Sequence, residues 1–469
     1  MNKVFYIIMV AFLAIAATGC IEDGFTPSSS DVLAFSVDTV AFDTVITAQG
    51  TITKQFVVYN HSKKQLNISS IKVKGVAQGA RFNINVDGLK GKEFHDIELR
   101  GNDSLYVFVE GFIDELKKDT PIEVTDYIEF VTNGVTQKVI LNAWGQDVNR
   151  INGDTIWDER TFTAARPYLI YDTLVVAPTG RLTIEPGTIM LFHKGAAMKC
   201  YGKMTAIGTR EKHIILRGDR LDKVVSDIDF DIMSGQWGGV VIGLGSHSNQ
   251  WHYVDMNGTE FGLQISSNSP RNPSLYMLNC RLHNSSGPVL LAWNAYITAY
   301  GCEFTDGAQG IVYLYGGNTV FAHNTIANFY LFKVAEEPLL NVFNIDDPEC
   351  PPIHAKIDNC IFYSISKGDI NAGDLTGTEI YLRNCLLKSK GTDDANFINI
   401  VWEGDPKFYT EREKYIFDYR VKDGSDAIAR GDRALTPDAA RYDRDGNDRF
   451  AEGSPTIGAY VYIPQPVKQ

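Results

Sequence analysis

The sequence predicts an all-β chain in which an N-terminal β-sandwich precedes a C-terminal parallel β-helix. Short apolar runs such as 182–184, 189–192 and 214–216 follow one another with Gly or Pro near their ends. Neither a hairpin turn signal nor a helical pattern long enough for a crossover lies between these runs. In addition, a short motif returns after 22 to 25 residues. A repeat of this length that holds several short strands is typical of one turn of a coil whose turns stack on each other.

The first 19 residues have the features of an export signal. Lys3 supplies a positive charge, and Val4–Ala17 form an apolar stretch too short to span a bilayer. This stretch runs into Ala17-Thr18-Gly19-Cys20, which resembles the lipobox of bacterial lipoproteins. The resemblance implies that residues 1–19 are removed as a signal peptide and that Cys20 becomes the acylated N-terminus, with palmitate among its chains. The alternative is an ordinary secretory signal that is cut nearby.

The residues around the expected acylation site indicate where such a lipoprotein would be located. Each buried CH₂ of an acyl chain contributes about 0.8 kcal/mol, so several chains would anchor the protein stably in a membrane. Glu22 and Asp23 follow Cys20 and resemble the outward-export signal of surface lipoproteins in gut-type gram-negative bacteria. We therefore expect an outer-membrane lipoprotein that faces the cell exterior, with residues 20–31 as a lipidated tether.

Composition and charge narrow the classes of partner. The chain has 469 residues, of which 44% are hydrophobic, so two or three domains with a large core are expected. The net charge of −13 argues against nucleic acid as a partner. The expected partners are therefore the membrane, through the N-terminal lipid, and a polysaccharide. The cysteines after Cys20 fit neither a Cys-x-x-Cys metal site nor a dense disulfide framework.

Residues 32–148 have the pattern of an antiparallel β-sandwich. Alternating apolar runs such as 105–109 and 127–131 are separated by turn clusters, of which Thr132-Asn133-Gly134 is one. This stretch contains no cysteine, so a disulfide between its sheets is not available. Its pattern resembles the immunoglobulin-like modules that precede β-helices in bacterial surface proteins. The resemblance implies a spacer, and the residues show no catalytic grouping.

Residues 149–463 carry the repeat. Gly180–Ile184 returns as Gly202–Ala206, and Asn279-Cys280 returns as Gly301-Cys302 after 22 residues. Asn359-Cys360 and Asn384-Cys385 are 25 residues apart. In a parallel β-helix each strand pairs with its equivalent in the next coil, and equivalent residues stack about 4.8 Å apart.

One column of equivalent residues is expected in or beside the core of this coil. Its predicted members are Asp255, Cys280, Cys302, Asn324, Cys360 and Cys385. Parallel side chains about 4.8 Å apart do not meet the Cβ separation of about 3.8 Å that a disulfide needs. We therefore expect buried, unbridged thiols that pack as small apolar residues, with a column of metal ligands as the alternative.

The segments that open and close this repeat region carry a family resemblance. The stretches "GDTIWDERTFTAARPYLIYDTLVVAPTGRLTIEPGT" and "GDPKFYTEREKYIFDYRVKDGSDAIARG" resemble the first coils and the closing segment of right-handed β-helix proteins with the pectin-lyase-like fold. The resemblance covers about residues 150–463 and implies that architecture. It implies no single function, because the fold carries lyases, hydrolases, adhesins and proteins without known activity.

An acidic insertion before Gln236-Trp237-Gly238-Gly239 holds the candidate metal ligands. Asp227, Asp229 and Asp231 alternate along it, so in an extended segment their carboxylates would share one face and could hold Ca²⁺. The alternative is a solvated loop. A second acidic insertion, with Glu336-Glu337 and Asp346-Asp347, could wall a groove.

Aromatic and titratable residues suggest a binding protein. Trp251, Trp293 and Trp402 could stack on sugar rings if they are exposed. His252, His283 and His323 have no acid or nucleophile at a suitable spacing, so they are expected to be structural. The sequence shows neither the base-and-cation set of a lyase nor the paired acids of a hydrolase on adjacent coils. We therefore favour non-catalytic binding of glycans or surface polymers. A polysaccharide lyase or glycoside hydrolase is the first alternative, and an adhesin for a protein partner is the second.

Overall fold

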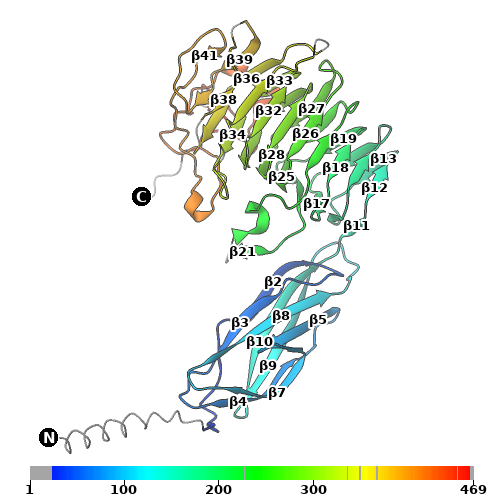
Figure 1. Ribbon diagram of the computed structural model, residues 1–469, viewed down its shortest axis with the longest axis vertical. Helices are drawn as coiled ribbons and strands as arrows, with labels where there is room; N and C mark the ends of the chain where they lie inside the picture. The colour runs from blue at the N-terminus through cyan, green and yellow to red at the C-terminus, as the bar shows by residue number, and fades with distance from the viewer. Residues whose placement is uncertain are drawn as a thin grey trace, which may run out of the picture. The chain divides into compact units, whose positions relative to one another are not determined.

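The computed structural model describes residues 24–225, 228–334, 336–347, 350–365, 368–375, 377–451 and 453–464. The expected signal peptide, Cys20 and Asp227 lie outside the described residues. The chain divides into two compact units, with the boundary between Asp147 and Val148, and Figure 1 shows both. Within the described ranges, no helix is long and apolar enough to cross a membrane.

The first unit is a β-sandwich of two five-stranded sheets. One sheet has the order β1 (Ala34–Phe35), β3 (Lys54–Tyr59), β8 (Ser104–Ile113), β5 (Ala80–Val86), β6 (Leu89–Gly91). The other has the order β2 (Thr39–Ile46), β10 (Val135–Gln146), β9 (Ile122–Thr132), β4 (Leu66–Val73), β7 (Glu93–Leu99). Neighbouring strands are antiparallel as expected, except that β10 pairs with β2 in parallel.

Alternation along the strands explains the sandwich. In β9 the residues are alternately buried and partly exposed, so one face of the strand points into the core. Phe56, Phe82 and Phe130 are among the largest wholly buried side chains, and the rings of Phe56 and Phe130 meet edge to face. The two sheets are therefore held together by apolar side chains without a disulfide.

The second unit is a parallel β-helix in which each complete coil gives one strand to each of three sheets. Sheet 1 contains β11 (Asn149–Ile151), β14 (Tyr168–Ile170), β17 (Ile189–Phe192), β20 (Ile214–Gly218), β25 (Val254–Thr259), β28 (Arg281–Ser285), β31 (Glu303–Gly307), β34 (Thr325–Asn328), β37 (Ile361–Ser364) and β40 (Leu386–Leu387). Sheet 2 contains β12 (Asp154–Ile156), β15 (Leu174–Val176), β18 (Met198–Cys200), β23 (Val240–Ile242), β26 (Leu263–Ser266), β29 (Leu290–Trp293), β32 (Val312–Tyr315), β35 (Leu340–Phe343) and β38 (Ile370–Asn371). Sheet 3 contains β13 (Glu159–Phe162), β16 (Arg181–Ile184), β19 (Lys203–Ile207), β24 (Asn249–His252), β27 (Pro273–Leu278), β30 (Tyr296–Tyr300), β33 (Asn318–Ala322), β36 (His354–Asp358), β39 (Glu379–Arg383) and β41 (Phe397–Ile398).

The remaining elements are short. They are β21 (Lys223–Val225), β22 (Ile228–Asp229), and the 3₁₀ turns η1 (Phe230–Ile232), η2 (Arg412–Lys414), η3 (Arg433–Leu435) and η4 (Asp438–Ala440). The prediction of an all-β chain with a β-sandwich followed by a parallel β-helix is confirmed. The strand order repeats through the sheets in sequence, so neither hairpins nor helices are needed between coils.

The cysteine column is confirmed in four coils. The pairing of Arg281 with Glu303 places Cys280 beside Cys302, and the pairing of Ile361 with Leu386 places Cys360 beside Cys385. Every cysteine among the described residues is free, and these four are buried. Burial raises the pKa of Cys302 and of Cys360 well above the ordinary thiol value, so both stay protonated.

The predicted place of Asp255 in that column is wrong. Asp255 pairs with Arg281, so the residue that precedes it, Val254, is the one equivalent to Cys280. Val254 is wholly buried, whereas Asp255 points to the outer face of sheet 1 and lines a cleft there. An apolar residue suits the inward position because an unpaired charge there would be strongly destabilising.

The column satisfies backbone groups at the corner between sheets 3 and 1. The N–H of Cys280 donates to Sγ of Cys302 at 3.4 Å, and the N–H of Cys302 donates to Oδ1 of Asn324 at 2.8 Å. The N–H of Asn324 then donates to Sγ of Cys360 at 3.3 Å. Each residue of the column therefore provides an acceptor for the coil before it, which accounts for the mixture of Cys and Asn.

The residue just before the column adopts a left-handed conformation in successive coils. The set consists of Tyr253, Asn279, Gly301, His323, Asn359 and Asn384, with φ between 50° and 63°. Gly and Asn tolerate this region best, which explains why the sequence motif is usually Asn or Gly before the column. This corner contains only one or two residues from β24 onward.

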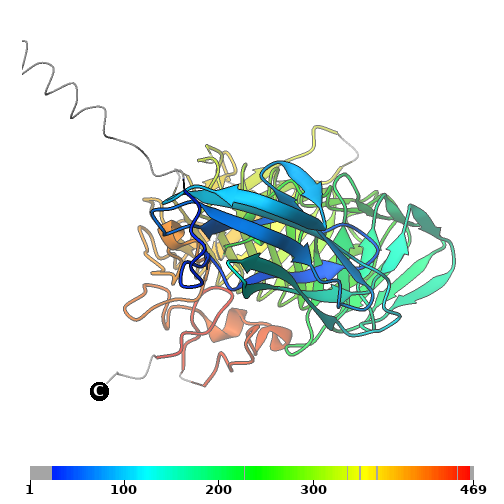
Figure 2. The ribbon, with the colours of Figure 1, turned by 90° about the horizontal axis from the view of Figure 1, so that it is seen from below.

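The C-terminal segment, residues 405–464, runs along sheet 1 and this corner. Figure 2 shows it, coloured orange to red, along one side of the β-helix. Its side chains Phe408, Tyr419 and Tyr460 form an apolar cluster with Ile361 and Leu386 from the outer face of sheet 1. The segment therefore buries the outer face of the later coils of sheet 1.

Candidate functional site

The three tryptophans that the sequence predicts to bind glycans differ in how far their side chains are exposed. The prediction for Trp251 is wrong, because its side chain has 0% exposure and pairs in register with inward-facing Ala206 and Met277. Trp402 is only partly exposed. Its indole N–H donates to Oδ1 of Asp393 at 3.0 Å and its ring packs on Phe397. Trp402 therefore does not offer a free ring, and Trp293 is the one of the three that stands at the surface, with 44% exposure.

Trp293 begins a row of aromatic side chains on the outer face of sheet 2. It pairs in register with Tyr315, which in turn pairs with Phe343. The ring centroids of Trp293 and Tyr315 are 5.3 Å apart, and those of Tyr315 and Phe343 are 5.0 Å apart. Parallel in-register strands stack equivalent side chains in this way. We call these three residues the aromatic row.

The free ring face of the aromatic row lies at its N-terminal end. Within the row each ring covers a face of its neighbour, so only the outer faces of the end residues can accept a ligand. In the coil before Trp293 the equivalent residue is Ser266, which is too small to cover the indole. A flat apolar surface of this kind can stack on the C–H face of a sugar ring.

A second set of outward side chains runs beside the row. Gln264, Leu291, Tyr313 and Asn341 pair in register along sheet 2. The hydroxyl of Tyr313 donates to Oε2 of Glu337 at 2.6 Å, and the same carboxylate accepts the N–H of Gly310 at 3.0 Å. The second acidic insertion therefore lies at the edge of this face and contributes a fixed carboxylate.

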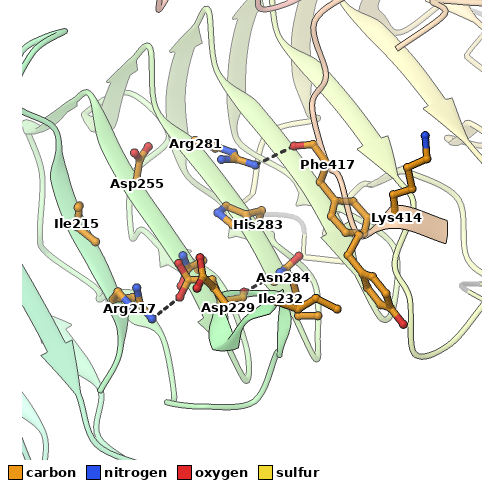
Figure 3. A pocket seen from close by; sticks show the side chains of 14 residues that line it. Ile215, Arg217, Asp229, Ile232, Asp255, Arg281, His283, Asn284, Lys414 and Phe417 are labelled. Carbon is orange, nitrogen blue, oxygen red and sulfur yellow. Dashed lines mark hydrogen bonds and ion pairs between the residues drawn. The ribbon is translucent and has the colours of Figure 1, made fainter. Parts of the chain in front are cut away.

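A cleft with a volume of about 530 Å³ lies on the outer face of sheet 1. Figure 3 shows its floor, made by β20, β25 and β28, between the first acidic insertion and the C-terminal segment. Its lining residues are Ile215, Arg217, Ile228, Asp229, Asp231, Ile232, Asp255, Asn257, Arg281, His283, Asn284, Lys414, Tyr415 and Phe417. The sequence predicts a groove at the second acidic insertion, whereas this cleft lies beside the first.

The floor of the cleft has two rows of side chains. Ile215, Asp255 and Arg281 pair in register across the three strands. Two positions further along, Asn257 pairs with His283 in the same way. Because alternate residues of a strand point to the same face, both rows project outward from sheet 1.

The walls of the cleft are fixed to the coil. On one side, Nδ2 of Asn284 donates to the backbone oxygen of Asp231 at 2.8 Å, and the indole N–H of Trp237 donates to the backbone oxygen of Asn257 at 2.7 Å. On the other side, the guanidinium of Arg412 donates to the backbone oxygens of Phe329 and Tyr330 at 3.0 and 2.7 Å. Loops held by such bonds can present their side chains in a defined geometry.

Asp255 is ionised and already has partners. Burial alone would raise its pKa, but the hydrogen bond from His213 and the charge of Arg444 outweigh burial and hold the pKa below its ordinary value. Nδ1 of His213 lies 3.0 Å from Oδ2 of Asp255, and Arg444 pairs with the other carboxylate oxygen. This aspartate therefore joins the C-terminal segment to the coil.

Asp231 has the opposite electrostatic situation. Burial raises its pKa, an effect that the ion pair with Arg217 opposes and the nearby charge of Asp229 increases. Among the described residues, no group of three or more His, Cys, Asp or Glu side chains is placed to hold a metal ion. Asp231 pairs with an arginine and Asp227 lies outside the described residues, so the Ca²⁺ site at Asp227, Asp229 and Asp231 stays a prediction.

Arg281 and His283 complete the polar floor. Nε of Arg281 donates to Oε1 of Glu303 at 2.8 Å, and its Nη2 donates to the backbone oxygen of Phe417 at 3.5 Å, a contact drawn in Figure 3. Burial, followed by the charge of Arg281, lowers the pKa of His283 well below its ordinary value. His283 is therefore a neutral imidazole at physiological pH.

The sequence identified part of this cleft. Asp229 and Asp231 were expected to be metal ligands and line the cleft, and His283 was expected to be structural and also lines it. Asn257, Tyr415 and Phe417 were missed. The signal that could have found the floor is the residue after each column position, because Asp255 and Arg281 both follow a buried residue at the same corner.

Comparisons with known proteins do not assign the chain to a family. No family model and no curated protein match the chain. A protein of unknown function from Porphyromonas gingivalis is similar at 11% identity over 24% of this chain and 46% of that one, with a TM-score of 0.18. The N-terminal domain of PorA is similar at 13% identity over 24% of this chain and 97% of that one, with a TM-score of 0.20. The catalytic unit of a thermostable GH87 alpha-1,3-glucanase from Streptomyces thermodiastaticus is similar at 9% identity over 72% of this chain and 80% of that one, with a TM-score of 0.20. TM-scores this low carry no argument about function.

Proposed function

We propose that this protein is a lipoprotein of the outer membrane that faces the cell exterior and binds glycans or surface polymers without cleaving them. The aromatic row on sheet 2 carries the proposal. It offers the free face of Trp293 at the surface, beside the partly exposed polar side chain of Gln264 in the preceding coil. Sugar recognition needs this combination, since a sugar presents an apolar C–H face for stacking and hydroxyl groups for hydrogen bonds.

Replacement of Trp293 by alanine tests this proposal. Loss of one stacked ring removes about 0.5–1.5 kcal/mol of specific aromatic contact in addition to the buried apolar area. The parent protein is first screened against a panel of acidic and neutral polysaccharides. For the polysaccharide that it binds best, we expect the affinity of the variant to be about tenfold lower. Affinity electrophoresis of the detergent-solubilised protein measures this change.

Trp157→Ala is the matched control for that experiment. Trp157 is 62% exposed and belongs to the same unit, but it lies outside the aromatic row. We expect this variant to be retained like the parent protein. Equal losses in the two variants, or no retention of the parent protein on any polymer, would contradict glycan binding by the row and favour an adhesin for a protein partner.

Glycan cleavage is the second candidate function, and one observation favours it. Asp231 and Asp255 line the same cleft, with the pKa of the first raised by burial and that of the second held low by His213 and Arg444. Carboxyl groups whose pKa values are pushed apart can divide the roles of acid and base. The same polymer incubations therefore include an assay for new reducing ends and for unsaturated products. Either product would replace the binding proposal with a hydrolase or a lyase.

The anchoring part of the proposal rests on the sequence around Cys20. Cys20→Ser removes the sulfur that would be acylated, so we expect the protein to leave the membrane fraction or to keep its signal peptide. Fractionation of cells, followed by mass spectrometry of the N-terminus, measures both results. An acylated, membrane-bound protein in this variant would exclude the lipobox at Cys20.

A further inference from the structure

We infer that the cleft on sheet 1 is a binding site for one neutral sugar residue, separate from the aromatic row, and that it rejects acidic sugars. The choice of a sugar as the ligand rests on the proposed function. The position of the site and its preference for neutral over acidic sugars rest on the cleft itself. Its volume of about 530 Å³ lies within the range of about 300–1,000 Å³ that is usual for small-molecule sites.

A buried acceptor without a partner belongs to the floor of this cleft. Asn257 is only 6% exposed and lines the floor, and its Oδ1 has no hydrogen-bond partner. Its amide is already used, because it hydrogen-bonds to the carboxylate of Asp231. A buried acceptor that stays unsatisfied costs about 1–3 kcal/mol, so a ligand that donates a hydrogen bond there restores that free energy. A sugar hydroxyl is such a donor, and a carboxylate is not.

The ion pairs of the cleft exclude an acidic ligand. Each cation already has a carboxylate partner: Arg217 pairs with Asp231, Arg281 with Glu303, and Lys414 with Glu411. Including the Arg444–Asp255 pair and Asp229, the cleft and its immediate partners carry five carboxylates and four cations. A uronate would therefore meet no unpaired cation among the described residues that line the cleft, and it would be repelled by Asp229, which is exposed.

Two aromatic side chains on the C-terminal segment provide the apolar part of the site. Tyr415 is 47% exposed and Phe417 is partly buried, and both line the cleft opposite the acidic insertion. The backbone oxygen of Phe417 accepts from Arg281, so the segment is tied to the floor at this point. A sugar in the cleft can thus place its C–H face on these rings and its hydroxyls on Asn257 and on the neutral imidazole of His283.

Saturation-transfer NMR on the detergent-solubilised full-length protein tests the inference with matched pairs of sugars. The pairs are glucose with glucuronic acid, galactose with galacturonic acid, and mannose with mannuronic acid. We expect at least one neutral sugar to bind and its uronic acid to give a signal at least fivefold weaker. Binding of none of the neutral sugars, or a uronic acid that binds as well as its neutral partner, would overturn the inference.

Two variants test whether the sugar binds in the cleft, and two control variants test whether exposed aromatic residues elsewhere contribute. Asn257→Leu removes the acceptor at similar volume, and Tyr415→Ala removes an exposed ring without disturbing the floor. We expect each to reduce the signal of the neutral sugar at least fivefold. Tyr442→Ala, which removes a tyrosine 50% exposed on the same segment but outside the cleft, and Trp293→Ala should both leave it unchanged. A signal that survives in Tyr415→Ala would refute the site. If Trp293→Ala loses polymer retention but keeps the neutral-sugar signal, the cleft binds sugar independently of the aromatic row that carries the proposed function.

Discussion

Replacing Arg444 with alanine will release the C-terminal segment from sheet 1. Arg444 is nearly buried, pairs with Asp255, and donates to the backbone oxygen of Asn279 at 2.9 Å. Removing one partner of a buried ion pair costs about 3–5 kcal/mol, because the other charge is left without compensation. The variant keeps Asp255 between sheet 1 and the segment, so we expect a loss of this size in the free energy that holds the segment in place.

Hydrogen exchange of the backbone amides in residues 440–450 measures this loss. A cost of about 3 kcal/mol or more corresponds to exchange that is faster by a factor of about a hundred or more. Arg441→Ala is the matched control. Arg441 belongs to the same segment and pairs with Asp448 at the surface, where such a pair contributes at most about 1 kcal/mol. If both variants changed exchange equally, the buried pair would not be what fixes the segment.

A second substitution, at Asp255, distinguishes two causes of the loss in Arg444→Ala. One is the missing attraction of the arginine, and the other is the uncompensated charge of Asp255. In the double variant Arg444→Ala, Asp255→Ala neither charge remains, so part of the protection in residues 440–450 should return. If the double variant is no better protected than Arg444→Ala alone, the loss comes from the missing contacts of the arginine and not from the stranded charge of Asp255.

Asp306→Asn will remove a pH dependence from the stability of the β-helix unit. Burial raises the pKa of Asp306 from 3.8 to about 6, an effect that the hydrogen bond from Tyr419 opposes. The folded state therefore binds this proton more tightly than the unfolded state. The stabilisation is fully present below the unfolded pKa and is lost as the pH rises through the folded pKa. Two units of pKa correspond to about 2–3 kcal/mol.

Chemical denaturation of the parent protein and of Asp306→Asn at pH 4, 5, 6 and 7 measures this effect. The difference in unfolding free energy, parent minus variant, should fall by about 2–3 kcal/mol between pH 4 and pH 7. Asn tolerates the left-handed backbone of this position, where φ is 60°, so the substitution adds little strain. Tyr419→Phe should make the fall steeper, since it removes the hydroxyl that lowers the pKa of Asp306. A constant difference across this pH range would show that Asp306 does not titrate there.

The architecture was predictable because the corner between sheets 3 and 1 repeats in the sequence. Asn279-Cys280 and Gly301-Cys302 mark equivalent positions, and the backbone geometry of the corner explains both residue types. Exact register was less accessible, since loops elsewhere in each coil differ in length. Counting residues back from Cys280 by the 25-residue repeat reaches Asp255, whereas the inward-facing residue is Val254. Polarity identifies the correct one, because the inward position must be apolar.

The cleft was harder to predict than the coil for a physical reason. Its floor comes from β25 and β28, but Tyr415 and Phe417 are more than a hundred residues later and arrive by docking of the C-terminal segment. No repeat relates these parts, so only tertiary packing brings them together. The error at Trp251 has a different cause. The register with Ala206 and Met277 was the information that would have shown it to face inward.

The corner between sheets 3 and 1 also limits how this molecule can acquire new recognition surfaces. From β24 onward it uses one or two residues, one of them left-handed, and its backbone N–H groups bond to the next coil. An inserted residue in these later coils would displace those bonds, whereas the first coils, from β13 to β20, have a longer corner at this place. The other two corners accept long loops, as the acidic insertion between β20 and β23 and the connection between β35 and β36 show. Evolution or protein engineering can therefore vary ligand choice at two edges of the coil, while the third edge keeps the repeat in register.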